Sequence, residues 1–141
     1  MIKTYSKINP ELLLNIVCGF DEVNSERNDI TEAGESLQCA ILRPPTNKVF
    51  KPHKHLYRHY TDDVKIQESF IVMKGSAEID IFDIDDLFLC TVKINTGDLV
   101  ILLNGGHSLK TLNDESILYE IKTGPYEGQI KDKIFIAETG Y

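Results

Sequence analysis

Short alternating runs of apolar and polar residues, separated by turn-forming residues, make up most of this chain. In the clearest run, Ala77, Ile79 and Ile81 alternate with Glu78 and Asp80, which is the pattern of a strand with one buried face. Other apolar runs lie at 37–42, before this run, and at 87–94, 99–103, 108–112 and 117–122, after it. Many short strands at close spacing, with no helical pattern between them, predict an all-β protein built as an antiparallel sandwich or barrel.

The first 35 residues have a different pattern. Asn9-Pro10-Glu11 has the composition of a helix start, and the apolar positions of 12–20 are compatible with a short N-terminal helix. Residues 21–35 are polar and without a clear period, which predicts a loop. A length of 141 residues fits one domain. We therefore expect an N-terminal helix and loop (1–35) packed on a β-barrel (36–126), with a C-terminal tail (127–141) that belongs to the same domain and includes an edge strand at 134–136.

Charge and hydropathy exclude two classes of partner. The net charge of −7 argues against binding to nucleic acid or to anionic lipid, both of which need a basic surface. The longest strongly apolar stretch, Leu99 to Leu103, is far shorter than a membrane span, and the N-terminal apolar run is broken by Asn15. The expectation is a cytoplasmic protein with no membrane partner.

The four histidines fall in two windows of the sequence. His53 and His55 are two residues apart on an expected strand, so both imidazoles point to the same face. Glu68 opens the next strand, and His107 follows the Gly105-Gly106 turn. Imidazole and carboxylate groups are the ligands that divalent transition metals prefer. A metal would satisfy polar groups whose unpaired burial costs about 1–3 kcal/mol each, whereas the alternative is a polar centre that holds only water.

This pattern resembles that of the cupins. His53-Lys54-His55, Glu68 and Gly75 are similar to the first cupin motif, and Gly97, Gly105 and His107 to the second. The resemblance implies a double-stranded β-helix, or jelly-roll, barrel. It also implies that one divalent transition metal ion (Fe, Mn, Ni or Zn) is bound by His53, His55, Glu68 and His107. The segment 118–126 is in addition similar to the end of small WbuC-type cupins, which occur among polysaccharide-biosynthesis proteins.

The segment between the two parts of the first motif, Leu56–Gln67, is longer than cupins usually have. We expect it to form a longer hairpin loop at the barrel mouth. Its aromatic, cationic and imidazole side chains are suited to holding an anionic or sugar-like ligand, or else pack on the barrel or remain solvated. These candidate substrate-binding residues are Tyr57, Arg58, His59 and Tyr60.

Three functions are compatible with these features. The first is a metal-binding cupin that acts on, or binds, a small polar ligand such as a sugar or sugar nucleotide in polysaccharide metabolism. The second is a metal-dependent dioxygenase of a small organic substrate, and the third is a non-catalytic ligand-binding module. No nucleophile–base pair is apparent, so whether the protein is an enzyme stays open. Many cupins pair, which predicts a homodimer, and the 99–103 strand is either core or covered by a second subunit.

Overall fold

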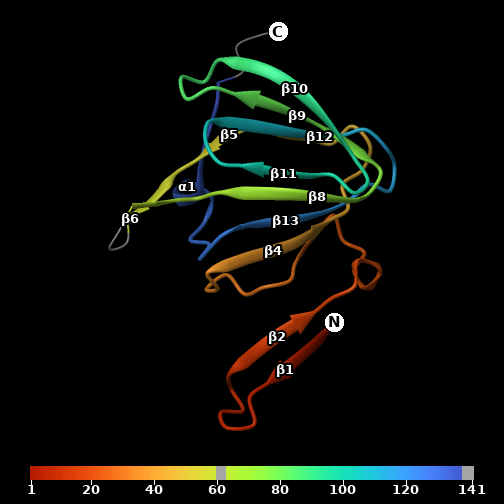
Figure 1. The fold of residues 1–141 in the computed structure, drawn as a ribbon, viewed down its shortest axis with the longest axis vertical. Helices are drawn as coiled ribbons and strands as arrows, with labels where there is room; N and C mark the ends of the chain where they lie inside the picture. The colour runs from red at the N-terminus through yellow and green to blue at the C-terminus, as the bar shows by residue number, and fades with distance from the viewer. Residues whose placement is uncertain (60–62, 138–141) are drawn as a thin grey trace.

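The computed structural model describes residues 1–59 and 63–137, and the described strands form two five-stranded antiparallel sheets that lie one above the other (Figure 1). The first sheet has the order β10 (Phe88–Asn95), β9 (Ser76–Phe82), β12 (Gly106–Thr111), β5 (Val49–His55) and β14 (Lys133–Phe135). The second has the order β11 (Leu99–Leu102), β8 (Glu68–Lys74), β13 (Ile117–Thr123), β4 (Leu37–Leu42) and β3 (Arg27–Asp29). The all-β prediction is confirmed, as a sandwich of two sheets; the described pairings do not close a barrel.

The core lies between the two sheets. Alternate residues of each strand point inward, as the period of two predicted. Ala77 and Ile79 of β9 are fully buried, whereas Glu78 and Asp80 are only half-buried. The buried cluster comprises Ala40, Leu42, Phe70, Val72, Ala77, Ile79, Ile94, Leu109 and Leu118. These residues come from strands of both sheets, so the apolar core lies between the sheets.

The predicted N-terminal helix is wrong. Residues 1–17 form a hairpin of β1 (Ile2–Tyr5) and β2 (Leu13–Val17), which projects from the two-sheet body in Figure 1. Asn9-Pro10 lies in the connecting turn, where the Ser6 hydroxyl accepts hydrogen bonds from the amides of Ile8 and Asn9. Most of the hairpin is exposed, so no neighbour buries the apolar face that would stabilise an amphipathic helix.

Two further expectations differ from the structure. The polar segment 21–35, predicted as a loop, contains the short 3₁₀ helix η1 (Phe20–Glu22) at its start and the edge strand β3. β11 lies at the edge of the second sheet. One of its faces is solvent-exposed, with Leu99 and Ile101, and the side chains of Val100 and Leu102 on the other face pack on the core. The interpretation of 99–103 as core therefore holds for one face only.

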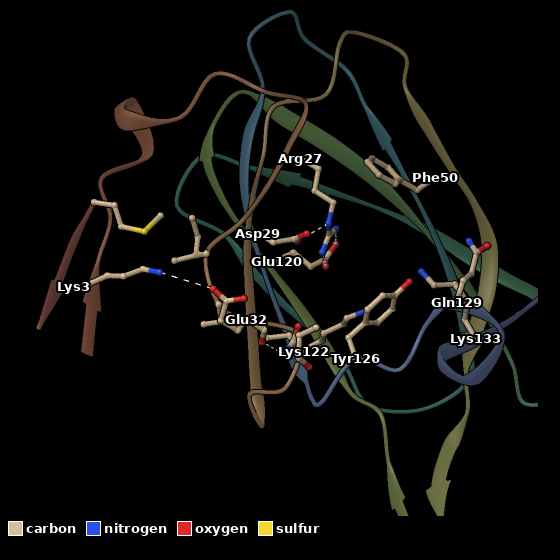
Figure 2. A pocket seen from close by; sticks show the side chains of 15 residues that line it. Lys3, Arg27, Asp29, Glu32, Phe50, Glu120, Lys122, Tyr126, Gln129 and Lys133 are labelled. Atoms are coloured by element: carbon tan, nitrogen blue, oxygen red, sulfur yellow. Dashed lines mark hydrogen bonds and ion pairs between the residues drawn. The ribbon is translucent and has the colours of Figure 1, made fainter. Parts of the chain in front are cut away.

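The C-terminal segment pairs with β5 in the first sheet. A short helix, α1 (Gln129–Asp132), leads into β14, which pairs with His53–His55 and confirms the predicted edge strand. Ile136 is buried against Gly106, where an added Cβ would lie 2.2 Å from the Ile136 Cδ1 atom. Between this segment and strands β3, β4 and β13, the two sheets enclose a cavity of about 670 Å³ (Figure 2).

Candidate metal centre and adjoining cavity

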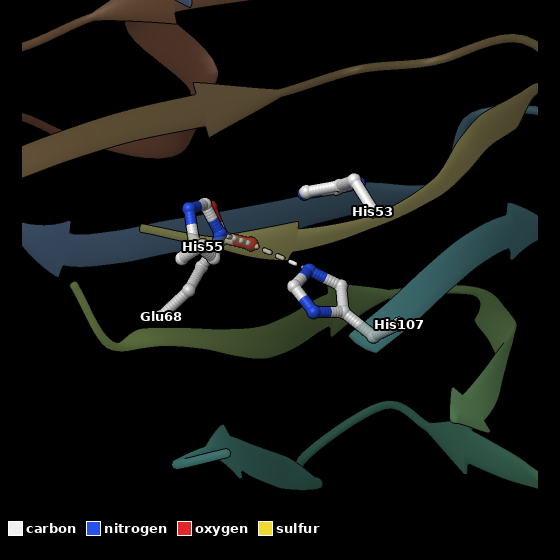
Figure 3. Close-up of side chains that lie close together, drawn as sticks. All are labelled: His53, His55, Glu68 and His107. Atoms are coloured by element: carbon white, nitrogen blue, oxygen red, sulfur yellow. Dashed lines mark hydrogen bonds and ion pairs between the residues drawn. The ribbon is translucent and has the colours of Figure 1, made fainter. Parts of the chain in front are cut away.

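Three strands bring the four predicted ligands together. His53 and His55 lie on one face of β5, Glu68 is the first residue of β8, and His107 pairs directly opposite His53 on β12. Figure 3 shows the four side chains converging between the sheets. Each offers a ligand atom, and these atoms all lie within 4.8 Å of one another. The exposed fractions are 5% for His53, 8% for His55, 3% for Glu68 and 3% for His107, so the cluster is shielded from bulk water.

Hydrogen bonds on the outer side of the cluster orient two of the imidazoles. The Nδ1 atom of His53 lies 2.8 Å from the carbonyl oxygen of Lys51, to which it donates. The Nδ1 atom of His55 lies 3.2 Å from the carbonyl oxygen of Asp132 and 3.4 Å from its carboxylate. With Nδ1 protonated, the Nε2 lone pair of His53 faces the cluster, as a metal ligand requires. His55 also turns Nε2 toward the cluster, where a metal would replace the proton of that nitrogen.

Glu68 is the negative charge at the centre. One of its carboxylate oxygens, Oε2, lies 2.9 Å from Nε2 of His107 and 3.3 Å from Nε2 of His55. Burial raises the pKa of Glu68, but the hydrogen bonds from His107 and His55 outweigh it and hold that pKa well below its usual range. The carboxylate is therefore ionised and available as an anionic ligand.

In the metal-free protein, the pKa values of the two β5 histidines are shifted in opposite directions. Burial, together with the neighbouring His107 and Lys133, lowers the pKa of His53 to about 3, so this imidazole is neutral. Burial also lowers the pKa of His55, but hydrogen bonds to Asp132 and Glu68 outweigh that effect and raise it to about 9. A metal at this position would take the place of the His55 proton.

These residues fit a divalent transition metal. The donor set is three imidazoles and one ionised carboxylate, and all four groups are buried and face one point. Such a set suits several first-row metals, and it leaves coordination positions for a ligand or water. The cluster could therefore hold one metal ion, and its donor chemistry does not by itself decide which.

Sequence reasoning missed the layer behind the ligands. Asp132 of α1 is fully buried, contacts His55, and accepts hydrogen bonds from the ammonium group of Lys122 at 3.1 and 3.2 Å. Its pKa is lowered to about 2, because the hydrogen bond from His55 and the charge of Lys122 outweigh burial, which raises it. Asp132 lies in a polar tail with no motif, so no local signal in the sequence marks it.

The predicted substrate-binding segment is a separate hairpin. β6 (Tyr57–His59) pairs with β7 (Asp63–Lys65), as expected for a longer hairpin, but only the backbone of Tyr57, Arg58 and His59 is described, and Tyr60 lies outside the described residues. At the base of this hairpin, Lys65 donates a hydrogen bond to the Asn104 side chain at 2.7 Å. A narrow crevice beside this contact is lined by His55 and His107.

The larger cavity lies on the opposite side of β5, toward the C-terminal segment. Its wall includes Arg27, Glu120, Lys122, Tyr126 and Lys133 (Figure 2). Arg27 donates two hydrogen bonds to the Glu120 carboxylate, at 2.8 and 3.0 Å, and the Lys122 ammonium lies over the Tyr126 ring. The Lys133 ammonium reaches the metal cluster, 3.2 Å from Nε2 of His53. Lys133 therefore connects the wall of this cavity with the candidate metal centre.

Comparison with known proteins adds structural relatives only. No protein-family model and no curated protein sequence matches the chain. Several solved structures do match it at low sequence identity. The capsular polysaccharide assembling protein CapF from Staphylococcus aureus is 15% identical with a TM-score of 0.63, and the match covers 81% of this chain and 31% of CapF.

Two smaller proteins match over more of their own length. The cupin domain of Cnp3 from Schizosaccharomyces pombe is 19% identical with a TM-score of 0.57, and the match covers 86% of this chain and 82% of that one. KdgF from Halomonas sp. is 15% identical with a TM-score of 0.54, covering 69% and 77% of the two chains. These neighbours are cupin-fold proteins, so the protein has the cupin fold that the two sequence motifs implied. In the part of the chain that the structure describes, no helix is long and apolar enough to cross a membrane.

Proposed function

We propose that this protein is a metal-binding cupin, in which His53, His55, Glu68 and His107 hold one divalent transition metal ion. The observation that supports this most directly is the convergence of four buried ligand atoms within 4.8 Å of one another. The outer hydrogen bonds of His53 and His55 add to it, because they hold Nδ1 of each ring on the outer side and turn Nε2 toward the cluster.

The proposed activity is binding, or chemical conversion, of a small polar ligand such as a sugar or sugar nucleotide. A bound metal would supply Lewis acidity toward a carbonyl or hydroxyl group of that ligand. The chain's own residues bind and orient the ligand in the 670 Å³ cavity, whose wall carries the donors and acceptors described above. Two observations favour a sugar: the WbuC-type resemblance of residues 118–126 and the likeness in fold to CapF, a capsular polysaccharide assembling protein.

A homodimer and a cytoplasmic location are parts of the same proposal. The exposed side chains of Leu99 and Ile101 on β11 give an apolar surface that a second copy would cover. Light scattering tests the dimer: a mass near 32 kDa, twice the 16.0 kDa of the chain, is expected, and a monomeric mass would contradict it.

The test of metal binding is a titration of chelator-treated protein with Zn²⁺, Mn²⁺, Ni²⁺ and, without oxygen, Fe²⁺. We expect one ion to bind per chain for at least one metal, and binding to be lost when His55 and His107 are both replaced by alanine. Equal binding by the wild type and this double variant would overturn the proposal. Oxygen uptake by the iron form with an organic substrate would identify a dioxygenase. Ligand-induced thermal stabilisation without turnover would identify a binding module.

A further inference from the structure

Lys133 occupies an unusual position, between the cavity and the candidate metal centre. Its backbone pairs with His55 in the sheet, and its side chain lines the cavity. The Lys133 ammonium lies 3.2 Å from Nε2 of His53, while Nδ1 of the same ring donates to the Lys51 carbonyl. Lys133 therefore donates a hydrogen bond to the lone pair that His53 would use to bind a metal.

One lone pair cannot serve both partners. When a metal binds Nε2 of His53, the ammonium must leave that nitrogen, yet its backbone stays fixed in β14 beside the site. A cation held close to a metal dication is repelled by it. An anionic group that contacts both the metal and the ammonium removes this repulsion and replaces the lost hydrogen bond with a charge-assisted one.

The other internal cations of the cavity already have carboxylate partners. Arg27 pairs with Glu120 and Asp29, and Lys122 pairs with Asp132. Lys133 differs: within residues 1–59 and 63–137, no carboxylate lies in ion-pair contact with its ammonium group. Among these cations, Lys133 is thus the one whose ammonium group is available for an ion pair with a negatively charged ligand.

The rest of the cavity limits the charge that this ligand can carry. Asp29, Glu32 and Glu120 also line it, and they would repel a second negative charge. Arg27, Tyr126 and Gln129 add donors, acceptors and a ring face that suit hydroxyl groups. We propose, on the premise of the metal site above, that the ligand is a small hydroxylated carboxylic acid, such as a sugar acid, whose single carboxylate is held between the metal and Lys133.

Metal and acid then strengthen each other's binding. The acid removes the ammonium from His53, and the metal provides the second contact for the carboxylate. Because coupling between two binding equilibria is reciprocal, the acid must raise the affinity for the metal by the same factor as the metal raises the affinity for the acid.

The experiment uses the full chain and Co²⁺, whose visible absorption changes when a ligand enters its coordination sphere. The probes are galacturonate, galactose and inorganic phosphate; the first two differ only in the carboxylate. For the wild type we expect galacturonate to change the spectrum and to bind at least about 10-fold more tightly than galactose. Saturating galacturonate should raise the Co²⁺ affinity.

Two variants separate the role of Lys133 from general effects of charge. Lys133→Met should lose the preference for galacturonate and bind Co²⁺, without acid, at least as tightly as the wild type. Lys133→Arg should keep part of the preference. Lys131→Met is the matched control, because Lys131 is exposed, pairs with Glu127 and lies two residues away; it should behave as the wild type does.

Three results would overturn the inference. They are equal binding of galacturonate and galactose by the wild type, an unchanged preference in Lys133→Met, and a preference of the site for phosphate over galacturonate. The first and third need no variant, so a folding failure of Lys133→Met leaves the inference falsifiable. Absence of Co²⁺, Zn²⁺, Mn²⁺, Ni²⁺ and Fe²⁺ binding would instead overturn the metal site itself, and the role of Lys133 with it.

Discussion

The four candidate ligands and the residues behind them come from different kinds of sequence. His53, His55, Glu68 and His107 lie on β5, β8 and β12, and the resemblance to the two cupin motifs implied that they meet. Asp132 contacts His55, Lys133 contacts His53, and Lys122 pairs with Asp132 behind them. Asp132 and Lys133 belong to a C-terminal segment without any motif. The comparison teaches that a motif resemblance can mark the candidate ligands of this site, whereas the residues behind them are brought there by long-range packing.

The largest expected effect is on the ligands themselves. His55→Ala removes one imidazole from the site, so metal affinity should fall by more than about 100-fold, beyond the usual effect of an outer partner. Competition with a coloured chelator measures this. Lys93→Ala on β10 is the control and should leave metal affinity unchanged, since Lys93 is exposed and is not one of the clustered ligand residues. A His55→Ala protein with wild-type affinity would remove His55 from the ligand set.

The outer layer should have a smaller effect. Asp132→Asn keeps the shape of the side chain but weakens the hydrogen bond that orients His55, so metal affinity should fall by about 10- to 100-fold. The same change leaves the Lys122 ammonium buried beside a neutral group, which destabilises the fold. The double variant Lys122→Met/Asp132→Asn should recover stability but not metal affinity. Recovery of both would show that Asp132 acts only as a partner of Lys122.

The pH dependence of stability tests the two histidines separately. The His55 pKa of about 9 lies above its unfolded value of about 6.5, so its stabilising contribution is complete below about pH 6.5 and is lost as pH rises through about 9. The His53 pKa of about 3 lies below the unfolded value, so its contribution is complete above about pH 6.5 and is lost as pH falls toward 3. The metal-free protein should therefore be most stable near pH 6.5.

Metal loading should remove the alkaline part of this profile, because the metal binds the deprotonated form of His55. Urea unfolding at pH values from about 6 to about 9.5, with chelator and with metal, measures the difference. A metal-free protein whose stability does not change between about pH 6.5 and 9 would contradict the hydrogen-bonded, protonated state of His55.

The smallest effect is expected at the opposite end of the chain. Deletion of residues 1–17 removes the β1–β2 hairpin, whose two strands form a sheet of their own and lie apart from β5, β8 and β12 in Figure 1. The deletion should change metal affinity less than about 3-fold, in contrast to the C-terminal changes, which act through direct contacts. Isothermal titration of the truncated protein checks this. A large loss of affinity would show that the hairpin supports the site.

Most of the fold and all four candidate ligands could be predicted from local pattern. Alternating polarity marked β4 and β9, because a strand with one buried face alternates in polarity. Runs bounded by turn residues marked β10, β11, β12 and β13. The prediction of an N-terminal helix was wrong for a physical reason. Asn9-Pro10 suits both a helix start and a tight turn, and burial of the flanking apolar residues decides between the two. The roles of Asp132 and Lys133 could not be predicted, because they depend on the pairing of the C-terminal segment with β5, which is distant in the sequence.

The most direct test of the central claim is a crystal structure of the metal-loaded protein with anomalous diffraction at the absorption edge of the bound metal. The account predicts one anomalous peak at about 2.0–2.3 Å from Nε2 of His53, His55 and His107 and from a carboxylate oxygen of Glu68. A peak elsewhere, or none within bonding distance of these four side chains, would contradict it.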